Sequence, residues 1–442
     1  MFGWVFLIQI KAIIMRLQVK KSRIQGEISV PGSKSHTIRA VAAAAMADGA
    51  SHIRSALFSA DTDAAVAAAR AFGAVVDLSD PQDWLIAGIN GEIQRPAGVV
   101  DLLNSGTSLR IFTALAALAD FPVSFDGDAS LRTRVMKNVL DALQPLGVTS
   151  HSLDGKCPLT VCGPLRGGHT RVDGKSSQFV TALLFAAPFA PEDTVMEVVN
   201  LNEVPYVEIT IDWLHRLGVD FDYAADYSWF KVRGRQHFSA FDLAIPADFS
   251  TATFPLAAAA VTGGEVLIHN LDFKDRQGDK AVFDYFTDMG VEVIKGAATQ
   301  VRMAHPLQAI EVDLNRTPDA LPAMAAVAAC AKGKTWLKNV PQARIKETDR
   351  IACMTRELRK MGAAIEELPD GMVITGGKLH GAEVDGCHDH RIVMALTIAG
   401  LAAEGITTVS TAEAADVTYP AFVTDFQRLG ADINVLHDEE FR

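Results

Sequence analysis

The sequence lacks the features that mark nucleic-acid-binding, zinc-binding and disulfide-stabilised proteins. Its 41 Lys and Arg residues are outnumbered by 53 Asp and Glu residues, which leaves a formal charge of −12. A general nucleic-acid binder needs a basic face to neutralise phosphates, so this charge argues against that class. The five cysteines are scattered, form no Cys-x-x-Cys pair and have no histidine at zinc-ligand spacing. We therefore expect reduced thiols, no metal site and no nucleic-acid partner.

Long hydrophobic runs are also missing. The opening stretch, 1–14, is apolar, but Lys11 interrupts it and it is too short to span a bilayer. It has neither basic residues ahead of the apolar run nor a clear small-residue cleavage site, so it does not match a signal peptide. We expect a cytoplasmic protein with no membrane partner. Because a strand-like alternation begins at Met15, we also expect translation to start there, which makes 1–14 an N-terminal extension that is not native.

Aliphatic residues are abundant, and they occur in a sixfold repeat. Hydrophobic residues make up 49% of the chain but aromatic residues only 7%, and 442 residues exceed what one hydrophobic core usually serves. Roughly every 72 residues, an amphipathic helical pattern ends at a glycine that suits a left-handed helix C-cap, and a strand-like pattern follows. These glycines are Gly73, Gly147, Gly218, Gly290, Gly362 and Gly430.

A second feature recurs in step with the glycines, namely an alanine-rich segment that is apolar on nearly every side. The six segments begin near Arg39, Arg110, Gln178, Thr251, Asp319 and Arg391. A helix that is apolar all round is normally buried, whereas an amphipathic helix lies at the surface. Six units, each with one buried helix, one surface helix and several strands, predict an α/β fold of two domains, with three units in each domain and helices in the middle.

Polar and cationic residues stand at the starts of the buried segments. A buried helix leaves its first N–H groups unsatisfied and carries a partial positive charge there, so several such ends facing one cleft would bind anions. Taken singly, each Ser, Asn or Asp at these positions is an ordinary N-cap more often than not. The cations Lys34, Arg39, Arg110 and Arg391 oppose the helix dipole, however, and therefore favour an anion between the helix ends.

Seven motifs resemble those of the EPSP synthases, which belong to the enolpyruvyl transferases, and they extend along nearly the whole chain from Met15 onward. They are PGSKSHTIRA (31–40), NSGTSLR (104–110), LRTRVM (131–136), KSSQ (175–178), NRTPDA (315–320), RIKETDR (344–350) and DHR (389–391). The resemblance implies a two-domain inside-out α/β barrel of the enolpyruvyl transferase type, with six βαβαββ repeats, three per domain. It also implies that 15–33 plus 246–442 form one domain, that 34–245 form the other, and that the cleft lies between them.

The activity implied by the resemblance joins two small anionic molecules. The enolpyruvyl (carboxyvinyl) group of phosphoenolpyruvate is transferred to the 5-hydroxyl of 3-phosphoshikimate by addition and elimination, with release of phosphate. This step lies in the shikimate pathway to chorismate and the aromatic amino acids. The resemblance further implies a monomer that acts without a metal or organic cofactor.

The resemblance also assigns roles residue by residue. Asp319 would accept the proton of the attacking hydroxyl, and Glu347 would donate a proton to C3 of phosphoenolpyruvate, with Lys34 sharing the proton transfer. The residues implied for 3-phosphoshikimate are Lys34, Ser35, Arg39, Ser176, Ser177, Gln178, Asp319 and Lys346. Those implied for phosphoenolpyruvate are Lys34, Asn104, Gly106, Arg134, Gln178, Arg350 and Arg391.

Several positions depart from the pattern of the family. Glu203 stands where well-known members have a serine that contacts phosphate, and a carboxylate beside a phosphate dianion is repulsive unless a cation intervenes. Gln342 replaces an asparagine, Val135 follows Arg134 where a proline is usual, and Val417 replaces a basic residue. The loss of that cation predicts altered affinity for phosphoenolpyruvate.

Four other functions were weighed against this one. The sister enzyme that acts on UDP-N-acetylglucosamine uses a cysteine on a mobile loop, and no cysteine occurs between 50 and 156. A relative that acts on a different hydroxylated ring stays open because of Glu203. A non-catalytic binding protein would have no use for buried carboxylates at Asp319 and Glu347, and an RNA-end-processing enzyme would need more positive charge. The assignment requires Lys34, Arg134, Lys346 and Arg391 to face one cavity.

Overall fold

The protein is described here by a computed structural model, which covers residues 12–440. Most of the opening stretch expected to be a non-native extension, 1–11, lies outside the described residues. The remainder, from Ala12, belongs to strand β1 (Ala12–Lys20), which pairs antiparallel with β24 (Asp432–Glu440) over its full length. Within the described part of the chain, no helix is long and apolar enough to cross a membrane.

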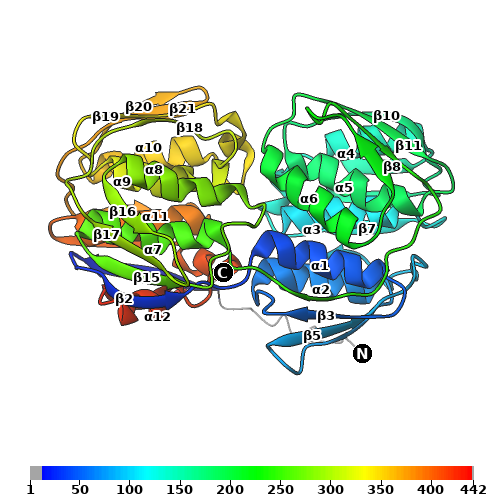
Figure 1. Ribbon diagram of the computed structural model, residues 1–442, viewed down its shortest axis with the longest axis horizontal. Helices are drawn as coiled ribbons and strands as arrows, with labels where there is room; N and C mark the ends of the chain where they lie inside the picture. Colours follow the sequence, from blue (N-terminus) through cyan, green and yellow to red (C-terminus); the bar gives the residue numbers. More distant parts are fainter. Residues whose placement is uncertain (1–11, 441–442) are drawn as a thin grey trace, which may run out of the picture.

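The molecule has two halves, which lie side by side (Figure 1). One hydrophobic core is formed by residues between Ile38 and Ile245. The other core is formed by residues 17–30 together with residues from Ala247 onward. The chain therefore passes between the halves twice, once before Lys34 and once after Ile245. On this basis we propose the domain division 34–245 and 15–33 plus 246–442.

Six four-stranded sheets share one strand order, in which a parallel pair is followed by two antiparallel strands. The unit around Asp319 shows the pattern. Its strands β18 and β19 are parallel, while β21 runs antiparallel to both β19 and β20. In chain order this unit contains β18 (Glu311–Asp313), α9 (Leu321–Ala328), β19 (Lys334–Lys338), α10 (Arg350–Lys360), β20 (Ala364–Leu368) and β21 (Gly371–Thr375).

Two further units are continuous in sequence, and both lie in the half formed by 34–245. The first contains β6 (Val100–Asp101), α3 (Gly106–Ala116), β7 (Val123–Asp126), α4 (Lys137–Leu143), β8 (Thr149–Leu153) and β9 (Lys156–Cys162). The second contains β10 (Gly168–Asp173), α5 (Ser177–Ala186), β11 (Thr194–Val199), α6 (Val204–Arg216), β12 (Phe221–Tyr223) and β13 (Trp229–Val232).

The other three units are completed by segments distant in sequence. One combines β14 (Asp242–Ala244) with α1 (Lys34–Met46), β3 (Ala50–Arg54), α2 (Ala60–Ala71), β4 (Val75–Asp77) and β5 (Asp83–Ala87). A second combines β2 (Gln25–Ser29) with α7 (Phe249–Thr262), β15 (Glu265–His269), α8 (Val282–Asp288), β16 (Val291–Ile294) and β17 (Thr299–Met303). The third combines β22 (Glu383–Asp385), α11 (His390–Ala402), β23 (Ile406–Ser410) and α12 (Phe422–Arg428) with β24 and β1.

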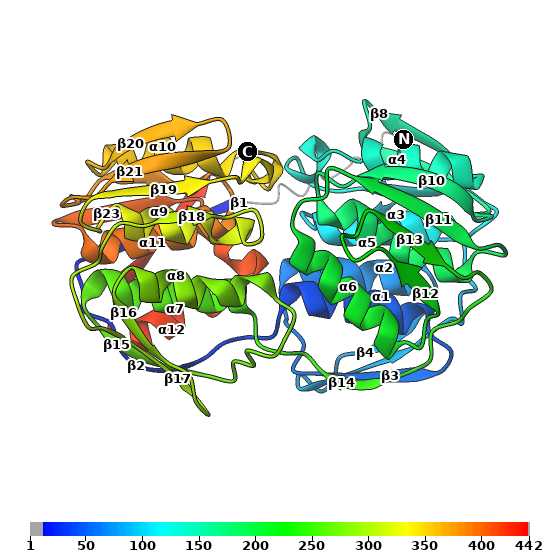
Figure 2. The same ribbon diagram turned by 45° about the horizontal axis from the view of Figure 1, so that its top comes forward.

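The sheets lie on the outside of each half, and helices lie between them (Figure 2). The alanine-rich helices α1, α3, α5, α7, α9 and α11 are almost wholly buried, as their apolar composition predicts. Each of the other six helices leaves some side chains exposed. The six repeat glycines all have a positive φ, from 74° at Gly218 to 104° at Gly73, which confirms the expected left-handed caps.

Candidate active site

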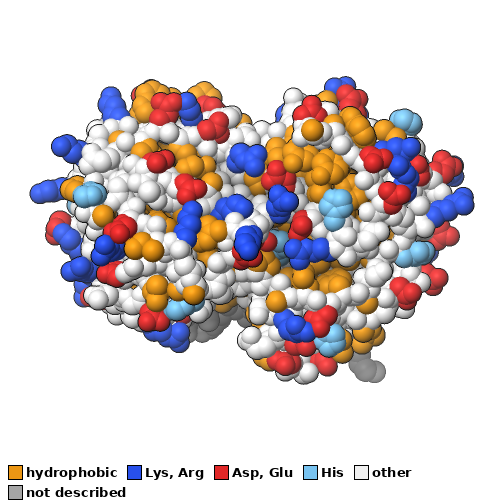
Figure 3. Space-filling model, in the orientation of Figure 1, with side chains coloured by type: hydrophobic (Ala, Val, Ile, Leu, Met, Phe, Trp, Pro, Cys, Tyr) orange, Lys and Arg blue, Asp and Glu red, His pale blue; other side chains and the backbone are white. Residues whose placement is uncertain are grey.

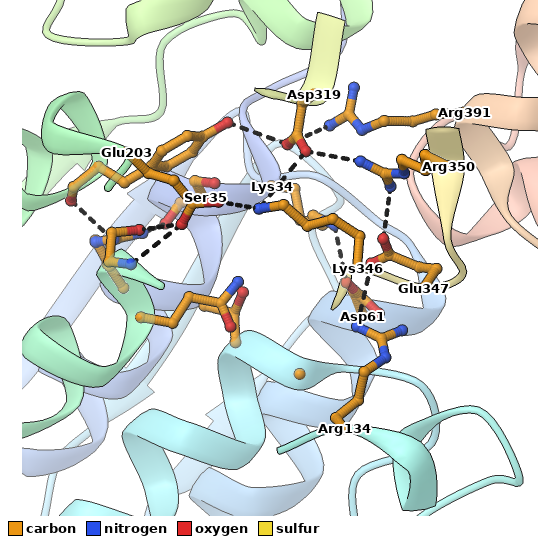
Figure 4. A pocket seen from close by; sticks show the side chains of 16 residues that line it. Lys34, Ser35, Asp61, Arg134, Glu203, Asp319, Lys346, Glu347, Arg350 and Arg391 are labelled. Carbon is orange, nitrogen blue, oxygen red and sulfur yellow. Dashed lines mark hydrogen bonds and ion pairs between the residues drawn. The ribbon is translucent and has the colours of Figure 1, made fainter. Parts of the chain in front are cut away.

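Residues at the starts of five of the six buried helices, all except α7, line one cavity between the two halves (Figure 4). Residues of both halves line it, and Lys34, Arg134, Lys346 and Arg391 are all among them, as the sequence-based assignment requires. On the face shown in Figure 3, Lys and Arg side chains gather along the line between the halves. The lining residues are Lys34, Ser35, Arg39, Asp61, Gly106, Thr107, Arg134, Ser177, Gln178, Glu203, Tyr206, Asp319, Lys346, Glu347, Arg350 and Arg391.

One part of this cavity, which we name the glycine side, consists of Lys34, Asp61, Gly106, Arg134 and Glu347. Lys34 is the first residue of α1, and its Nζ lies 3.1 Å from Asp61 Oδ2. Burial raises the pKa of Asp61, although the Lys34 ammonium acts in the opposite direction. Arg134 Nη1 lies 3.5 Å from Glu347 Oε1. The glycine side thus holds two cations against two carboxylates.

Gly106 begins α3 and leaves the space in which two arginine side chains end. A Cβ at this position would lie 2.6 Å from Arg110 Nη1 and 3.3 Å from Arg134 Nη1. Asn104 does not line the cavity, and its Oδ1 instead accepts a hydrogen bond from Arg134 Nη2 at 3.0 Å. The absence of a side chain at Gly106 and the amide of Asn104 therefore both fix the position of Arg134.

Asp319 precedes α9 in a short 3-10 turn and is surrounded by cations. Its carboxylate accepts hydrogen bonds from Arg350 Nη1 at 2.8 Å, Arg391 Nη2 at 3.1 Å and the Tyr206 hydroxyl at 3.1 Å. Burial alone would raise the pKa of Asp319, but Arg391, Lys346 and Arg350 together outweigh it and hold the pKa well below its usual range. Asp319 is therefore ionised in this arrangement.

Glu347 has the same balance of effects. Burial would raise its pKa, but Arg350 and Arg134 outweigh burial and hold the pKa well below the ordinary value for a glutamate. Arg350 Nη2 donates to Glu347 Oε2 at 2.5 Å, and Arg350 Nε donates to Asp389 Oδ2 at 2.8 Å. Arg350 thus links the two carboxylates assigned to catalysis, Asp319 and Glu347.

A second group, which we name the serine side, consists of Ser177, Glu203 and Lys346 of the cavity wall together with Ser176, which lines an adjacent pocket. Glu203 Oε2 accepts hydrogen bonds from Ser177 Oγ at 2.8 Å, from the Ser177 backbone N–H at 3.1 Å and from Ser176 Oγ at 3.3 Å. Glu203 Oε1 forms an ion pair with Lys346 Nζ. The residue is 1% exposed. Ser176, Ser177 and Lys346, which are all assigned to 3-phosphoshikimate, therefore contact the Glu203 carboxylate instead.

The Arg39 guanidinium donates hydrogen bonds to several oxygen atoms of the protein. It donates to Thr210 Oγ1 at 3.0 Å, to the Tyr206 carbonyl at 3.1 Å and to the Ser35 carbonyl at 2.9 Å. Burial lowers the pKa of Arg39 to about 10, so it remains protonated at neutral pH.

Gln178 lines the cavity, and its Oε1 accepts a hydrogen bond from Arg110 Nη1 at 2.5 Å.

Four lining residues are outside the site residues predicted from the sequence: Asp61, Thr107, Glu203 and Tyr206. The one local signal for Asp61 is its place in the first turn of α2, where Ser59 forms a capping box with Thr62. Of the departures from the family pattern, Gln342 is buried and donates to the Asn315 carbonyl at 3.0 Å.

Ion pairs between the lining side chains leave little free space in the cavity. Its lining contributes six Lys or Arg side chains and four carboxylates, and the free space is about 40 Å³. That space is on the order of one or two water molecules. Among residues 12–440, no group of three or more His, Cys, Asp or Glu side chains is placed to hold a metal ion. An anionic ligand entering this site would exchange the internal carboxylates for its own charges.

Comparison with known proteins identifies the family. The family model for EPSP synthase (3-phosphoshikimate 1-carboxyvinyltransferase) matches residues 19–426. A 3-phosphoshikimate 1-carboxyvinyltransferase of Ruminiclostridium cellulolyticum is 46% identical over 425 residues, which cover 96% of this chain and 100% of that protein. A protein of the same name from Acetivibrio thermocellus is 45% identical over 423 residues, which cover 95% of this chain and 99% of that protein.

A solved structure supports the same relationship. The EPSP synthase of Acinetobacter baumannii superposes with a TM-score of 0.80 at 26% identity, and the match covers 96% of this chain and 100% of that chain. The fold class predicted from the resemblance, a paired inside-out α/β barrel with six repeats, is confirmed. The chain belongs to the EPSP synthase (3-phosphoshikimate 1-carboxyvinyltransferase) family.

Proposed function

We propose that this protein transfers the enolpyruvyl group of phosphoenolpyruvate to the 5-hydroxyl of 3-phosphoshikimate and releases phosphate. The observation that carries the proposal is the convergence of six cations from four motifs on one cavity between the halves. The two substrates together bring a charge of roughly −5 to −6 at neutral pH, which needs such countercharge when confined. Helix N-termini at the same cavity add further donors.

Each substrate has its own set of binding residues, and Lys34 and Gln178 belong to both sets. We assign Lys34, Ser35, Arg39, Ser176, Ser177, Gln178, Asp319 and Lys346 to 3-phosphoshikimate. We assign Lys34, Gly106, Arg134, Gln178, Arg350 and Arg391 to phosphoenolpyruvate, with Asn104 acting through Arg134 because it does not line the cavity. Tyr206 joins this set because its hydroxyl donates to Asp319.

The reaction is an addition followed by an elimination. The substrate hydroxyl oxygen forms a bond to C2 of phosphoenolpyruvate, its proton passes to Asp319, and C3 receives a proton from Glu347, with Lys34 beside it. In the elimination, Glu347 takes a proton back from C3, the C2–O bond to phosphate breaks and the double bond is restored, while the proton held by Asp319 leaves with the phosphate. Every proton transfer in this scheme uses side chains of this chain.

Substrate binding must change the pKa values of both catalytic carboxylates. While the arginines hold their pKa values low, Asp319 is a weak base and Glu347 is ionised, so Glu347 has no proton to donate. The phosphate and carboxylate groups of the substrates pair with Arg350 and Arg391. Asp319 and Glu347 then lose part of their stabilisation by these arginines, so their pKa values rise toward the range that proton transfer needs. Closure of the halves over the substrates would also exclude water.

We further propose that the protein works as a monomer in the cytoplasm. All five cysteines are free, as expected for a reducing compartment. Light scattering of the purified protein tests the monomer, and a mass twice that of the chain would contradict it.

The activity is tested by incubating the protein with phosphoenolpyruvate and each of three acceptors, 3-phosphoshikimate, shikimate and UDP-N-acetylglucosamine, and measuring released phosphate. We expect release with 3-phosphoshikimate. Asp319→Ala should abolish release while ligand binding remains measurable by calorimetry. Asp288→Ala, at an exposed position at the end of α8, is the matched control and should retain full turnover. Turnover of Asp319→Ala at the rate of the unaltered protein would remove Asp319 from its role.

A further inference from the structure

The serine side presents an unusual arrangement, because a carboxylate of the chain fills an anion site that has its own donors. Three donors converge on Glu203 Oε2, namely two serine hydroxyls and the backbone N–H at the start of α5. The Lys346 ammonium pairs with Glu203 Oε1. Hydroxyls, a helix N-terminal N–H and an ammonium are the groups that recognise a phosphate. Glu203 therefore occupies a position whose chemistry suits a ligand anion.

The backbone at Glu203 supports the view that its carboxylate is held there against a conformational cost. Glu203 has φ 57° and ψ 40°, a left-handed conformation that is uncommon for residues other than glycine, asparagine and aspartate. It is the N-cap of α6, but its side chain makes no capping hydrogen bond to that helix. The side chain instead points toward the start of α5 and Lys346 (Figure 4). Contacts outside its own helix therefore retain it.

We propose that Glu203 is a specificity-determining residue that competes with the phosphate of the acceptor for Ser176, Ser177 and Lys346. The inference rests on the proposed function, because the acceptor is taken to be a phosphorylated cyclic alcohol. A phosphate dianion and a carboxylate cannot share the same donors, since like charges in a buried site repel. The acceptor phosphate must therefore displace the Glu203 side chain, and the displacement weakens binding of the phosphorylated acceptor. An unphosphorylated acceptor leaves Glu203 in place.

The test compares Glu203→Ser, Glu203→Gln and the unaltered protein. We expect Glu203→Ser to lower the Kd of 3-phosphoshikimate at least about tenfold, because it frees the donors and leaves the Lys346 charge unopposed. The KM for phosphoenolpyruvate should change less than about twofold, and the affinity for shikimate should not increase. Glu203→Gln removes the charge but keeps an acceptor for the serines, so it should lie between the two. Calorimetry gives each Kd and phosphate release gives each KM.

A matched control lies on the same helix. Glu208 contacts Tyr227 and Arg316, and it does not line the cavity. Glu208→Gln should therefore leave both affinities unchanged. Thermal unfolding of each variant shows whether Glu203 also has a structural role. If Glu203→Ser does not fold, Glu203→Gln carries the comparison.

The outcomes separate this inference from the proposed function. Inorganic phosphate serves as a probe that needs no turnover: it should raise the unfolding temperature of Glu203→Ser more than that of the unaltered protein. If no protein releases phosphate from phosphoenolpyruvate but Glu203→Ser gains affinity for both phosphate and 3-phosphoshikimate, the proposed function fails and the inference stands. If turnover occurs and the Kd of 3-phosphoshikimate is unchanged or raised in both variants, Glu203 is a structural residue and the inference is wrong.

Discussion

The glycine side and the serine side of the cavity neutralise negative charge in different ways. On the glycine side, Glu347 and Asp61 are paired with Arg134 and Lys34, so each internal anion faces a cation. On the serine side, Glu203 is held by two serine hydroxyls and a backbone N–H as well as by Lys346. The glycine side therefore holds cations that can pair with a ligand anion. On the serine side, the Glu203 carboxylate already occupies the position of a ligand anion.

The difference between the two sides arises at Glu203, where the sequence differs from the family pattern while the surrounding residues match it. Glu347 belongs to a motif that the resemblance predicts, and its charge is part of the proposed chemistry. Glu203 replaces a serine of the family pattern, and its neighbours on α5 and before α10 keep the residue types that would contact phosphate. A substitution that fills a preserved site affects affinity for one substrate more than it affects catalysis.

The largest effect is expected from removing Arg350, which is 1% exposed and serves Asp319, Glu347 and Asp389 at once. Arg350→Met leaves the buried carboxylate of Asp389 and the partly buried carboxylates of Asp319 and Glu347 without this cation. Removing one partner of a buried ionic network costs about 3–5 kcal/mol, so we expect unfolding at lower denaturant concentration as well as loss of turnover. Denaturant titration and phosphate release measure the two effects.

The control for this change is Arg216→Met at the end of α6. Arg216 is about half-exposed and pairs with Asp212 one turn earlier, so its removal should cost less than about 1 kcal/mol. If Arg350→Met were as stable as Arg216→Met, the carboxylates of Asp319, Glu347 and Asp389 would not depend on Arg350 for their stabilisation, and this ion-pair network would not be structural.

A second prediction concerns Asp279, which lies behind the cavity and shares the Tyr206 hydroxyl with Asp319. Burial, together with the nearby Asp319 charge, raises the pKa of Asp279 to about 6. The unfolded chain therefore releases this proton near pH 4, while the folded protein retains it until about pH 6. The contribution to stability falls as the pH rises through this window.

Asp279→Asn removes that ionisation. The variant should match the unaltered protein below about pH 4 and exceed its free energy of unfolding by roughly 2–3 kcal/mol at pH 7. Urea titrations across this pH range measure the difference, with Asp288→Asn as the exposed control. A difference between Asp279→Asn and the unaltered protein that is independent of pH would show that Asp279 is not the titrating group.

The sequence predicted the helices and most of the residues that line the cavity, because both depend on local patterns. The glycine repeat and the apolar segments located all six buried helices, and residues at the starts of five of them, all except α7, line the cavity. Asp61 was missed because it begins an outer helix, and the Tyr206 hydroxyl because it reaches a carboxylate 113 residues away. These contacts depend on how the helices and the two halves pack together, which no local pattern encodes.

A third prediction sharpens the comparison from the glycine side. Gly106→Ala would place a methyl group against the ends of Arg110 and Arg134, so these guanidinium groups must shift. We expect the KM for phosphoenolpyruvate to rise about tenfold, equivalent to about 1.4 kcal/mol, while the KM for 3-phosphoshikimate stays within about twofold. Gly98→Ala is the control, since a Cβ there meets nothing within 4 Å. A rise in both KM values would mean that the two sides are not independent.

The smallest effect is expected at Asn104, which the sequence assigned to phosphoenolpyruvate and which instead supports Arg134. Asn104→Ala removes one hydrogen bond to Arg134 Nη2, while Glu347 and Ser130 still contact that guanidinium. The loss of one such bond costs about 1 kcal/mol, so the KM for phosphoenolpyruvate should rise about three- to fivefold with kcat unchanged. Asn434→Ala, at an exposed position on β24, should change neither constant. If Asn104→Ala raised the KM as much as Gly106→Ala does, the amide would contact the substrate directly, and Arg134 would need no support from it.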